Sequence, residues 1–523
     1  MEASSDSVEF PGTGESSQEQ VEARTVAQAA GPGARTEPGA MGNASVVVPA
    51  GPAAGAPGEV ARLHGELPVR GSKRVTLSSI SEGRFGRMFR RLRPMPPLTD
   101  EQLLELSESM REPVTPTGWN GTAQDFDNPD IPAGYTYLGQ FVDHDITFDP
   151  TSTLQRENDP DALTDFRSPR FDLDSVYGSG PVDEPFQYRR GTNGMRMLYG
   201  PNSRGEMDLP RNEEGTALIG DPRNDENTIV SQLQLLFLRL HDKFATEVES
   251  DSSVPEEGRF SEAQRRVRWH YQWVIVHDFL PRVIGADSLK QICDVDDEGR
   301  IVDIRRAHYR PKTTPYMPVE FSAAAYRYGH SQVRGIYNLN DVVRDRPIFV
   351  SGSLQDETQD LRGFRPLPAQ WTVSWPLFFP IDGSTPQPSR LLDSRLSQGL
   401  FDLPDSGGSL AFRNLKRGQV LGLPSGQDVA KALNVADVLT GPHLAAPDPT
   451  PLWFYVLKES ELVAGGRHLG PVGGRIVGEV LLGLLELDPR SWWSAQPGWR
   501  PTIPDADGDG VIGVPDLVTF ASP

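Results

Sequence analysis

Cysteine is almost absent from this chain, since Cys293 is the only one among 523 residues. A single cysteine cannot form an internal disulfide, so stability must come from the core, a metal or a cofactor. Long apolar runs are also lacking. The most apolar stretch, 477–487, contains Glu479 and Glu486 and is much shorter than the roughly 18 residues of a membrane span. We therefore expect no transmembrane segment.

Basic residues are scarce relative to acidic ones. The chain has 51 Lys and Arg against 72 Asp and Glu, which gives a formal charge of −21. Binding to nucleic acids and to anionic membranes depends on Lys and Arg, so this balance excludes nucleic acid as the main partner and disfavours such membranes. The N-terminus has no basic start followed by an apolar stretch, so we expect no conventional secretory signal.

Aromatic residues are nearly missing from residues 1–74, which are rich in Ala, Gly, Pro, Ser and Glu. Such a segment buries too little apolar surface to offset the entropy lost on ordering. We therefore predict a disordered leader over 1–74. The richer composition that follows predicts a folded domain over 75–490, and 491–523 is predicted to be a short C-terminal tail.

The clearest periodicity in the chain is helical. Apolar side chains from Ile229 to Phe244 recur at positions that form one stripe of a helix. A second helix is predicted to start at Ser261, with Gln264 completing a capping box, and to stop before Pro281. Further helices are predicted over 138–145, 318–332, 428–433, 452–462 and 474–487.

The chain contains 51 glycines and 47 prolines, and stretches rich in both separate the predicted helices. Few runs alternate between apolar and polar residues as a strand would. The predicted fold class is therefore mainly α, with long irregular loops and little strand. A chain of helices joined by long irregular loops is expected to pack around a bound group such as a cofactor.

A polar cluster is predicted on the helix that contains residues 139–145. Gln140 and His144 lie four residues apart on one face, while Asp143 and Asp145 flank the imidazole. The aromatic and apolar neighbours of this cluster indicate a partly buried site. A surface histidine between two solvated acids is the alternative, and the residues alone leave both open.

A second histidine follows a run of small residues. His330 ends the segment 321–330, whose alanines would allow a flat ligand to approach, so His330 could be an axial metal ligand. A packed core histidine is the alternative. Asn414 could accept a hydrogen bond from a ligating imidazole and so set its tautomer. Arg223 and Glu226 precede another helix, where acidic capping would be an ordinary explanation.

Two stretches offer oxygen donors to a hard cation. In the first, Ser168, the carbonyl of Arg170, Asp172 and Asp174 alternate along the chain and, with one remote carboxylate, would suit Ca²⁺. A polar loop with an Asx turn is the alternative.

The second stretch places Asp505, Asp507, Asp509 and Asp516 at positions 1, 3, 5 and 12 of a calcium-loop pattern. Position 12 is Asp instead of Glu, and nearby prolines leave little room for an entering helix. A second calcium site and an acidic turn therefore both stay open.

Taken in order, these motifs resemble those of the animal-type haem peroxidases, in the peroxidase–cyclooxygenase superfamily, over about residues 75–490. The chain looks like a bacterial-style member. The resemblance implies a helical haem-peroxidase fold, haem b, calcium, and reduction of hydrogen peroxide through a ferryl intermediate with oxidation of small organic donors or halides. It also implies an extracellular protein, with the cytoplasm as the alternative.

The resemblance also implies a role for each motif. His144 matches the distal histidine, Gln140 its neighbour and Arg223 the distal arginine. The residues implied to hold the haem are His330 as iron ligand, Asn414 behind it, Arg327 and Arg417 on the propionates, and Asp143 and Glu226 in ester links. The implied calcium ligands are Asp145, Ser168, the Arg170 carbonyl, Asp172 and Asp174.

Two other functions remain as alternatives. Fatty-acid dioxygenases of the superfamily carry a radical-forming Tyr three residues before the proximal histidine, a position that is Arg327 here, with Tyr326 and Tyr328 beside it. The second alternative is a non-catalytic, calcium-binding scaffold, which the combined presence of His144, Arg223 and His330 disfavours.

Overall fold

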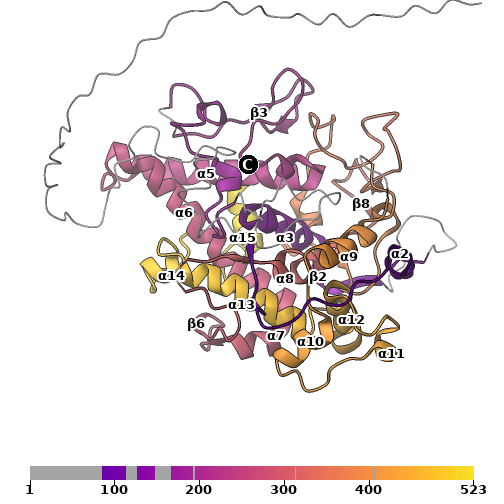
Figure 1. The fold of residues 1–523 in the computed structure, drawn as a ribbon. Coiled ribbons are helices and arrows are strands. Elements are labelled where there is room, and N and C mark those ends of the chain that lie inside the picture. The colour runs from indigo at the N-terminus through magenta and orange to yellow at the C-terminus, as the bar shows by residue number, and fades with distance from the viewer. Residues whose placement is uncertain are drawn as a thin grey trace, which may run out of the picture. The chain divides into compact units, whose positions relative to one another are not determined.

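The computed structural model describes residues 85–113, 126–147, 167–192, 195–312, 314–404 and 408–522 (Figure 1). The predicted leader, 1–74, and the predicted start of the folded domain, 75–84, lie outside the described residues. The described chain is mainly helical with little strand, so the predicted fold class is confirmed.

Helices supply most of the regular structure. The α-helices among the described residues are α2 (Asp100–Ser109), α3 (Ala133–Ile146), α4 (Asp174–Tyr177), α5 (Thr228–Ser250), α6 (Arg259–Val274), α7 (Leu280–Ile292), α8 (Val319–Ser322), α9 (Leu410–Val420), α10 (Gly426–Ala432), α11 (Gly441–Leu444), α12 (Leu452–Ala464), α13 (Pro471–Leu487), α14 (Trp492–Ala495) and α15 (Val514–Ala521). The 3-10 turns are η3 (Pro185–Gln187), η4 (Pro222–Asp225), η5 (Glu256–Gly258), η7 (Ala325–His330), η8 (Trp375–Leu377) and η9 (Gln398–Leu400), and η6 (Ile275–Phe279) is a π turn.

Strands occur in the described residues as short pairs. One parallel pair joins β1 (Phe85–Gly86) to β7 (Met317–Pro318). The antiparallel pairs are β2 (Asp127–Pro132) with β10 (Pro388–Arg390), β3 (Gly200–Pro201) with β4 (Met207–Asp208), β5 (Cys293–Val295) with β6 (Ile301–Ile304), and β8 (Ile336–Tyr337) with β9 (Arg346–Pro347).

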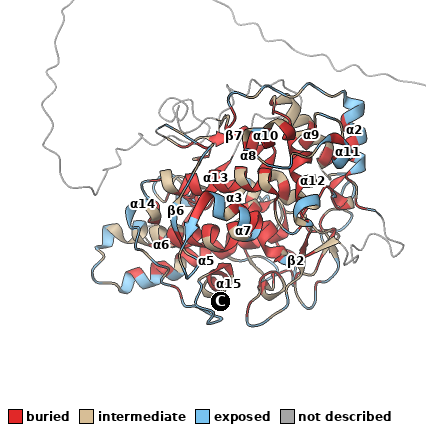
Figure 2. Cartoon of the chain, turned by 90° about the horizontal axis from the view of Figure 1, so that it is seen from below, coloured by how far each residue is buried: buried red, intermediate tan, exposed pale blue. Residues whose placement is uncertain are grey.

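The core lies between the long helices. Helix α13 packs against α7, and α5 packs against both α3 and α6. Figure 2 shows buried residues running through α3 and α13 in the middle of the packed helices. Helix α3 is buried around most of its circumference, so its sequence has no clear apolar stripe. For that reason the predicted helix, 138–145, missed the beginning of α3 at Ala133.

Two predicted helix boundaries are wrong. Helix α6 begins at Arg259 with no side-chain cap, and the chain continues through η6 into α7 instead of stopping before Pro281. Pro281 is the second residue of α7, in the first turn of that helix, a position where proline is common. The helix predicted over 318–332 is interrupted, since Ala324 (φ −137°, ψ −78°) separates α8 from η7.

The predicted C-terminal tail packs on the helical body. Leu517 and Val518 of α15 are buried in the shared core, and the rings of Phe244 and Phe520 lie 5.2 Å apart. The backbone N–H of Val514 donates to Asp278 Oδ2 at 2.8 Å. Among the described helices, none is both long and apolar enough to cross a membrane.

Candidate functional site

A cavity of about 610 Å³ lies among α3, η4, the start of α5 and η7. Its size falls within the range of cofactor pockets, about 300–1,000 Å³. Seven residues singled out from the sequence line it, namely Gln140, Asp143, His144, Arg223, Glu226, Arg327 and His330. The fold thus brings together three segments that are far apart in the chain.

His144 is buried and held by a residue that the sequence analysis did not single out. Its Nδ1 lies 2.8 Å from Oδ1 of Asn224, and Asn224 Nδ2 donates to Gln234 Oε1 at 2.8 Å. An amide oxygen only accepts, so His144 Nδ1 carries the proton and donates it. The lone pair is therefore on Nε2, which lies 3.8 Å from Glu226 Oε1.

Gln140 and Glu226 are joined across the cavity. Gln140 Nε2 donates to Glu226 Oε1, and Gln140 Oε1 accepts from Asn227 Nδ2 at 3.1 Å. Burial raises the pKa of Glu226, although the positive charge of Arg223 acts against this shift. The site therefore contains a carboxyl group that is partly shielded from water and close to the imidazole.

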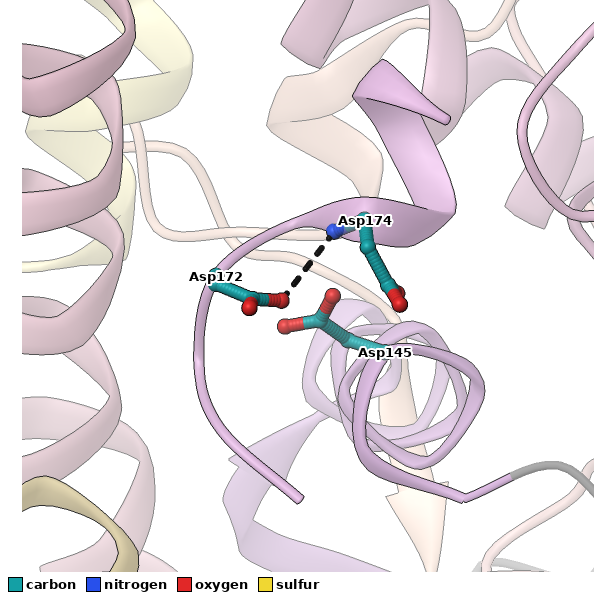
Figure 3. A group of neighbouring side chains, drawn as sticks. All are labelled: Asp145, Asp172 and Asp174. Carbon is teal, nitrogen blue, oxygen red and sulfur yellow. Dashed lines mark hydrogen bonds between the residues drawn. The ribbon is translucent and has the colours of Figure 1, made fainter. Parts of the chain in front are cut away.

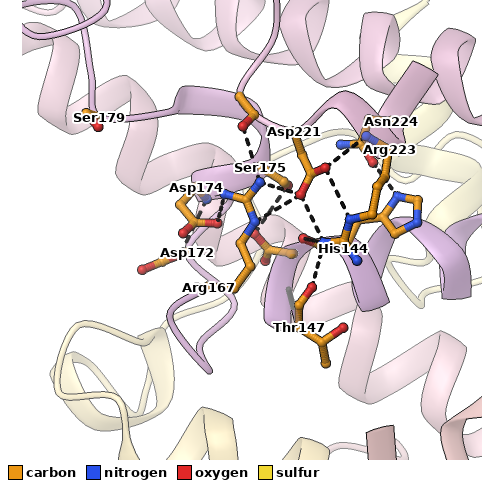
Figure 4. Close-up of polar contacts among 12 residues, drawn as sticks. His144, Thr147, Arg167, Asp172, Asp174, Ser175, Ser179, Asp221, Arg223 and Asn224 are labelled. Carbon is orange, nitrogen blue, oxygen red and sulfur yellow. Dashed lines mark hydrogen bonds and ion pairs between the residues drawn. The ribbon is translucent and has the colours of Figure 1, made fainter. Parts of the chain in front are cut away.

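Arg223 is fixed against the end of α3 (Figure 4). Its Nη2 donates to the His144 carbonyl at 3.0 Å and to Asp221 Oδ2 at 2.9 Å, and its Nε donates to Asp221 Oδ1 at 3.2 Å. Asp221 is fully buried and also pairs with Arg167. Burial alone would raise the pKa of Asp221, but these two guanidinium groups outweigh it and lower that pKa to about 2.

On the other side of the cavity, His330 contacts Asn414. Asn414 is buried on α9, and its Nδ2 lies 2.9 Å from His330 Nδ1. Burial, together with the charges of Arg327 and Arg417, lowers the pKa of His330 to about 3. The imidazole is thus neutral at physiological pH, which is the form that binds a metal. Ligation of a metal through Nε2 requires Nδ1 of His330 to carry the proton and donate it in a hydrogen bond. If the amide of Asn414 is turned so that its oxygen and nitrogen exchange places, the oxygen accepts that hydrogen bond.

Arg327 provides a partly buried positive charge at the cavity. Its Nε has no hydrogen-bond partner in the described part of the chain, and the Trp453 indole donates to its carbonyl at 3.1 Å. Burial lowers the pKa of Arg327, against the opposing charge of Asp143. An unsatisfied guanidinium nitrogen at a cavity wall fits an anionic group such as a haem carboxylate.

An acidic cluster lies behind His144. Carboxylate oxygens of Asp145, Asp172 and Asp174 lie within 4.8 Å of one another and point toward a common centre (Figure 3). Asp145 Oδ2 and Ser168 Oγ are buried without a hydrogen-bond partner among the described residues. The backbone N–H of Arg170 donates to the Ser168 carbonyl at 2.7 Å, which forms a turn beside the cluster.

This cluster has the donor set of a hard cation site. Burial, with Asp172 and Asp174 adding to it, raises the pKa of Asp145 well above its usual range. Burial also raises the pKa of Asp174 to about 7, although Arg167 lies 3.0 Å from its carboxylate. Several buried carboxylates with unsatisfied oxygens fit Ca²⁺, which takes six to eight oxygen ligands.

Arg167 links the acidic cluster to the cavity. It pairs with Asp174 on one side and with Asp221 on the other, and Asp221 in turn holds Arg223 (Figure 4). No local pattern in the sequence points to Arg167. Asp221 lies two residues before Arg223, and this proximity along the chain is the one signal in the sequence that could have pointed to it.

The C-terminal loop gathers three of its four predicted ligands. Asp505, Asp507 and Asp509 lie close together and are exposed. Asp516 is buried and accepts from the backbone N–H groups of Ala506 and Gly513, at 2.7 and 2.8 Å. Calcium binding by this loop stays a prediction.

Comparison with known proteins identifies relatives of this chain. The family model "Animal haem peroxidase" matches residues 155–444, which is more than half of the chain. A chorion peroxidase of Aedes aegypti is 25% identical over 365 residues, covering 64% of this chain and 42% of that protein. A thyroid peroxidase of Sus scrofa is 26% identical over 380 residues, covering 62% of this chain and 38% of that protein.

Solved structures show the same fold at low sequence identity. Peroxidase A from Dictyostelium discoideum is 15% identical, with a TM-score of 0.58, over 83% of this chain and 95% of that one. A fatty acid alpha-dioxygenase from Oryza sativa is 14% identical, with a TM-score of 0.52, over 76% of this chain and 74% of that one. The present chain spans about two fifths of the length of the curated relatives named above.

Proposed function

The chain belongs to the animal haem peroxidase family, and we propose that it is a haem-dependent peroxidase. In this reaction hydrogen peroxide is reduced to water while small organic donors or halides are oxidised. The observation that carries the proposal is that His144, Arg223 and His330, from three distant segments, line one cavity of cofactor size.

Haem b, when bound, supplies the redox-active iron. His330 would ligate that iron, and Asn414 would hold the imidazole in the ligating tautomer. Arg327 and Arg417 would pair with the haem carboxylates. Asp143 and Glu226, which both line the cavity, would provide the carboxylates for ester links.

The protein's own groups move the proton that peroxide cleavage requires. His144 Nε2, left unprotonated by the bond from Nδ1 to Asn224, accepts a proton from hydrogen peroxide and returns it to the departing oxygen. Arg223 keeps its charge at all relevant pH values, so it stabilises the negative charge that develops on that oxygen. Asp221 holds the guanidinium in position for this role.

We also propose that calcium binds at Asp145, Ser168, the Arg170 carbonyl, Asp172 and Asp174. The buried, unsatisfied oxygens of Asp145 and Ser168 support this site. Because Asp145 directly follows His144, a cation there would hold the end of α3 and so the position of the imidazole.

Fatty-acid oxygenation is the weaker candidate. Dioxygenases share the fold at 14% identity, which carries no information about activity. The residue three positions before His330 is Arg327, which cannot form the tyrosyl radical of that reaction. Oxygen uptake with a polyunsaturated fatty acid distinguishes the two activities.

Replacement of His330 tests the proposal. The parent, expressed with haem supplied, is expected to show a Soret band and to oxidise a phenolic donor with hydrogen peroxide. His330→Ala should lose most of its bound haem, whereas His443→Ala, at an exposed histidine on α11, should behave like the parent. An unchanged haem spectrum in His330→Ala would contradict the assignment of the ligand, and a folded parent without haem would contradict the function.

A further inference from the structure

Arg167 is buried between two acidic residues (Figure 4). Its side chain is 2% exposed, and its Nη1 donates to Asp174 Oδ1 at 3.0 Å. Its Nε donates to Asp221 Oδ2 at 3.0 Å, and its Nη2 donates to the Gly220 carbonyl at 3.2 Å as well as to the same carboxylate. All three nitrogens of the guanidinium therefore have acceptors. Since a buried N–H group without an acceptor costs free energy, the guanidinium is held in this one orientation.

Asp221 is shared between Arg167 and Arg223. The carboxylate is fully buried, and its Oδ2 accepts from both guanidinium groups. Its Oδ1 accepts from Nε of Arg223 at 3.2 Å and from the backbone N–H of Arg223 at 2.9 Å. Rotation of the carboxylate would break its contacts with both arginines at once. Arg167 thus fixes the plane of the carboxylate against which the Arg223 side chain lies.

The orientation of Arg223 depends on that carboxylate. Arg223 lines the cavity, and its side chain is 24% exposed, so most of the side chain is enclosed by protein. Its guanidinium also donates to the carbonyls of His144 and Thr147. Asp221 differs from these neutral acceptors because it is charged and binds both Nε and Nη2. An ion pair with hydrogen bonds from two nitrogens fixes the direction of a guanidinium more firmly than a neutral acceptor does.

The direction of the Arg223 side chain matters because the charge that it stabilises develops at one place, on the departing oxygen of hydrogen peroxide. Such stabilisation depends on groups that are oriented before the bond breaks. A misplacement of about 1 Å can lower a rate about 100-fold. Without Arg167, the Asp221 carboxylate would be free to rotate together with the guanidinium of Arg223. A residue that prevents this rotation affects the rate without contacting peroxide.

We propose that Arg167 is a positioning residue for peroxide cleavage, which acts through Asp221 on Arg223. The inference rests on the proposed peroxidase function and adds a residue to it. Arg167 is not among the described residues that line the cavity, so it influences the reaction through the carboxylate that it shares. The competing role is neutralisation of the acidic cluster through Asp174, in which Arg167 would stabilise the fold without orienting Arg223.

Replacing Arg167 by Gln and by Lys tests the inference. Gln removes the charge, whereas Lys keeps the charge but offers one nitrogen where Arg offers three. With saturating calcium, we expect Arg167→Gln to slow the reaction with hydrogen peroxide about 10-fold or more, and Arg167→Lys to slow it less. The later oxidation of ferrocyanide and the haem content should match the parent. The dissociation constant for cyanide should rise as the peroxide rate falls, because Arg223 also attracts that anion.

A double-mutant cycle shows whether Arg167 acts through Arg223. Arg223→Gln removes the charge that Arg167 orients, so adding Arg167→Lys to it should cause no further loss of rate. Additive losses would overturn the inference. Arg390→Lys is the matched control, since Arg390 is also a buried arginine that pairs with two acids, Glu112 and Asp127. Arg390 is not among the described residues that line the cavity, so this variant should react with peroxide at the parent rate.

The remaining outcomes are equally decisive. Parent-like peroxide rates and cyanide affinities in both Arg167 variants would overturn the positioning role. Equal slowing of the peroxide and ferrocyanide steps would also overturn it, because it would show a general loss of structure. If Arg167→Gln does not fold, Arg167→Lys and the double-mutant cycle still decide. A parent that binds no haem or does not react with peroxide would instead refute the proposed function, and the inference with it.

Discussion

His144 and Asn224 are joined by a buried hydrogen bond of 2.8 Å between Nδ1 and Oδ1, although they lie 80 residues apart in the chain. This bond assigns the proton to Nδ1 and leaves Nε2 free to accept one. The amide is itself oriented by its donation to Gln234. The basic nitrogen of the site thus depends on a residue that does not line the cavity.

Replacing Asn224 by Ala should slow the reaction with hydrogen peroxide about 10- to 100-fold, because the imidazole loses the partner that sets its tautomer. Haem should stay bound, since His330 is untouched. Stopped-flow absorption at the Soret band measures the rate. Asn224→Asp keeps the acceptor but adds a charge that favours the imidazolium, so the acid limb of its pH–rate profile should move to higher pH. Parent-like rates in both variants would refute this role.

Chelation of calcium should lower the melting temperature. Without a cation, the carboxylates of Asp145, Asp172 and Asp174 lie close together with no positive ion between them. Their mutual repulsion would then destabilise the folded state. Asp174→Asn should reduce the effect of added calcium on the melting temperature, measured by differential scanning calorimetry. Asp507→Asn serves as the control for the C-terminal loop. If Asp507→Asn removes the calcium effect and Asp174→Asn does not, the stabilising ion binds at the C-terminus.

Haem in the parent should resist extraction into acidified organic solvent, because Asp143 and Glu226 both present carboxylates to the cavity. Asp143→Asn with Glu226→Gln should make all haem extractable, and each single variant should retain a link through the other residue. Peroxide treatment before extraction allows the links to form. Complete extraction from the treated parent would show that no ester exists.

Acid should weaken the contribution of three histidines to stability, two of them buried and the third partly buried. Burial lowers the pKa values of His241, His270 and His277 to about 4 each. The unfolded chain binds protons at these residues below about pH 6.5, while the folded chain does so only near pH 4. The contribution of these three histidines to the free energy of unfolding should therefore fall as pH drops from about 6.5 to about 4, whereas buried carboxyl groups with raised pKa values, such as Asp174, contribute in the opposite direction.

Urea unfolding at a series of pH values measures that slope. His270 Nε2 accepts from the Thr502 backbone N–H at 2.8 Å, so its protonation should also loosen the C-terminal segment. His270→Gln cannot ionise and should show a shallower slope, whereas His443→Gln, at an exposed position, should match the parent. Equal slopes in the parent and in His270→Gln would contradict the prediction.

The sequence by itself determined the fold class and most long helices, and it predicted the candidate residues of the site. Periodic apolar residues predicted the helix that is α5, and short motifs predicted His144, Arg223 and His330, because both signals are local in the chain. Where burial surrounds a helix, as in α3, the periodic signal disappears. Where a proline falls in a first helical turn, as in α7, the local rule gives a false stop.

Only the tertiary structure decided which distant groups meet. Asn224 reaches His144, and Arg167 reaches Asp221, because η4 and the segment before α4 pack against the end of α3. Arg362, Gly363 and Phe364 line the cavity because backbone hydrogen bonds hold their segment against residues 225–228. Such contacts depend on how separate segments pack in space, and neither residue type nor spacing along one segment encodes them.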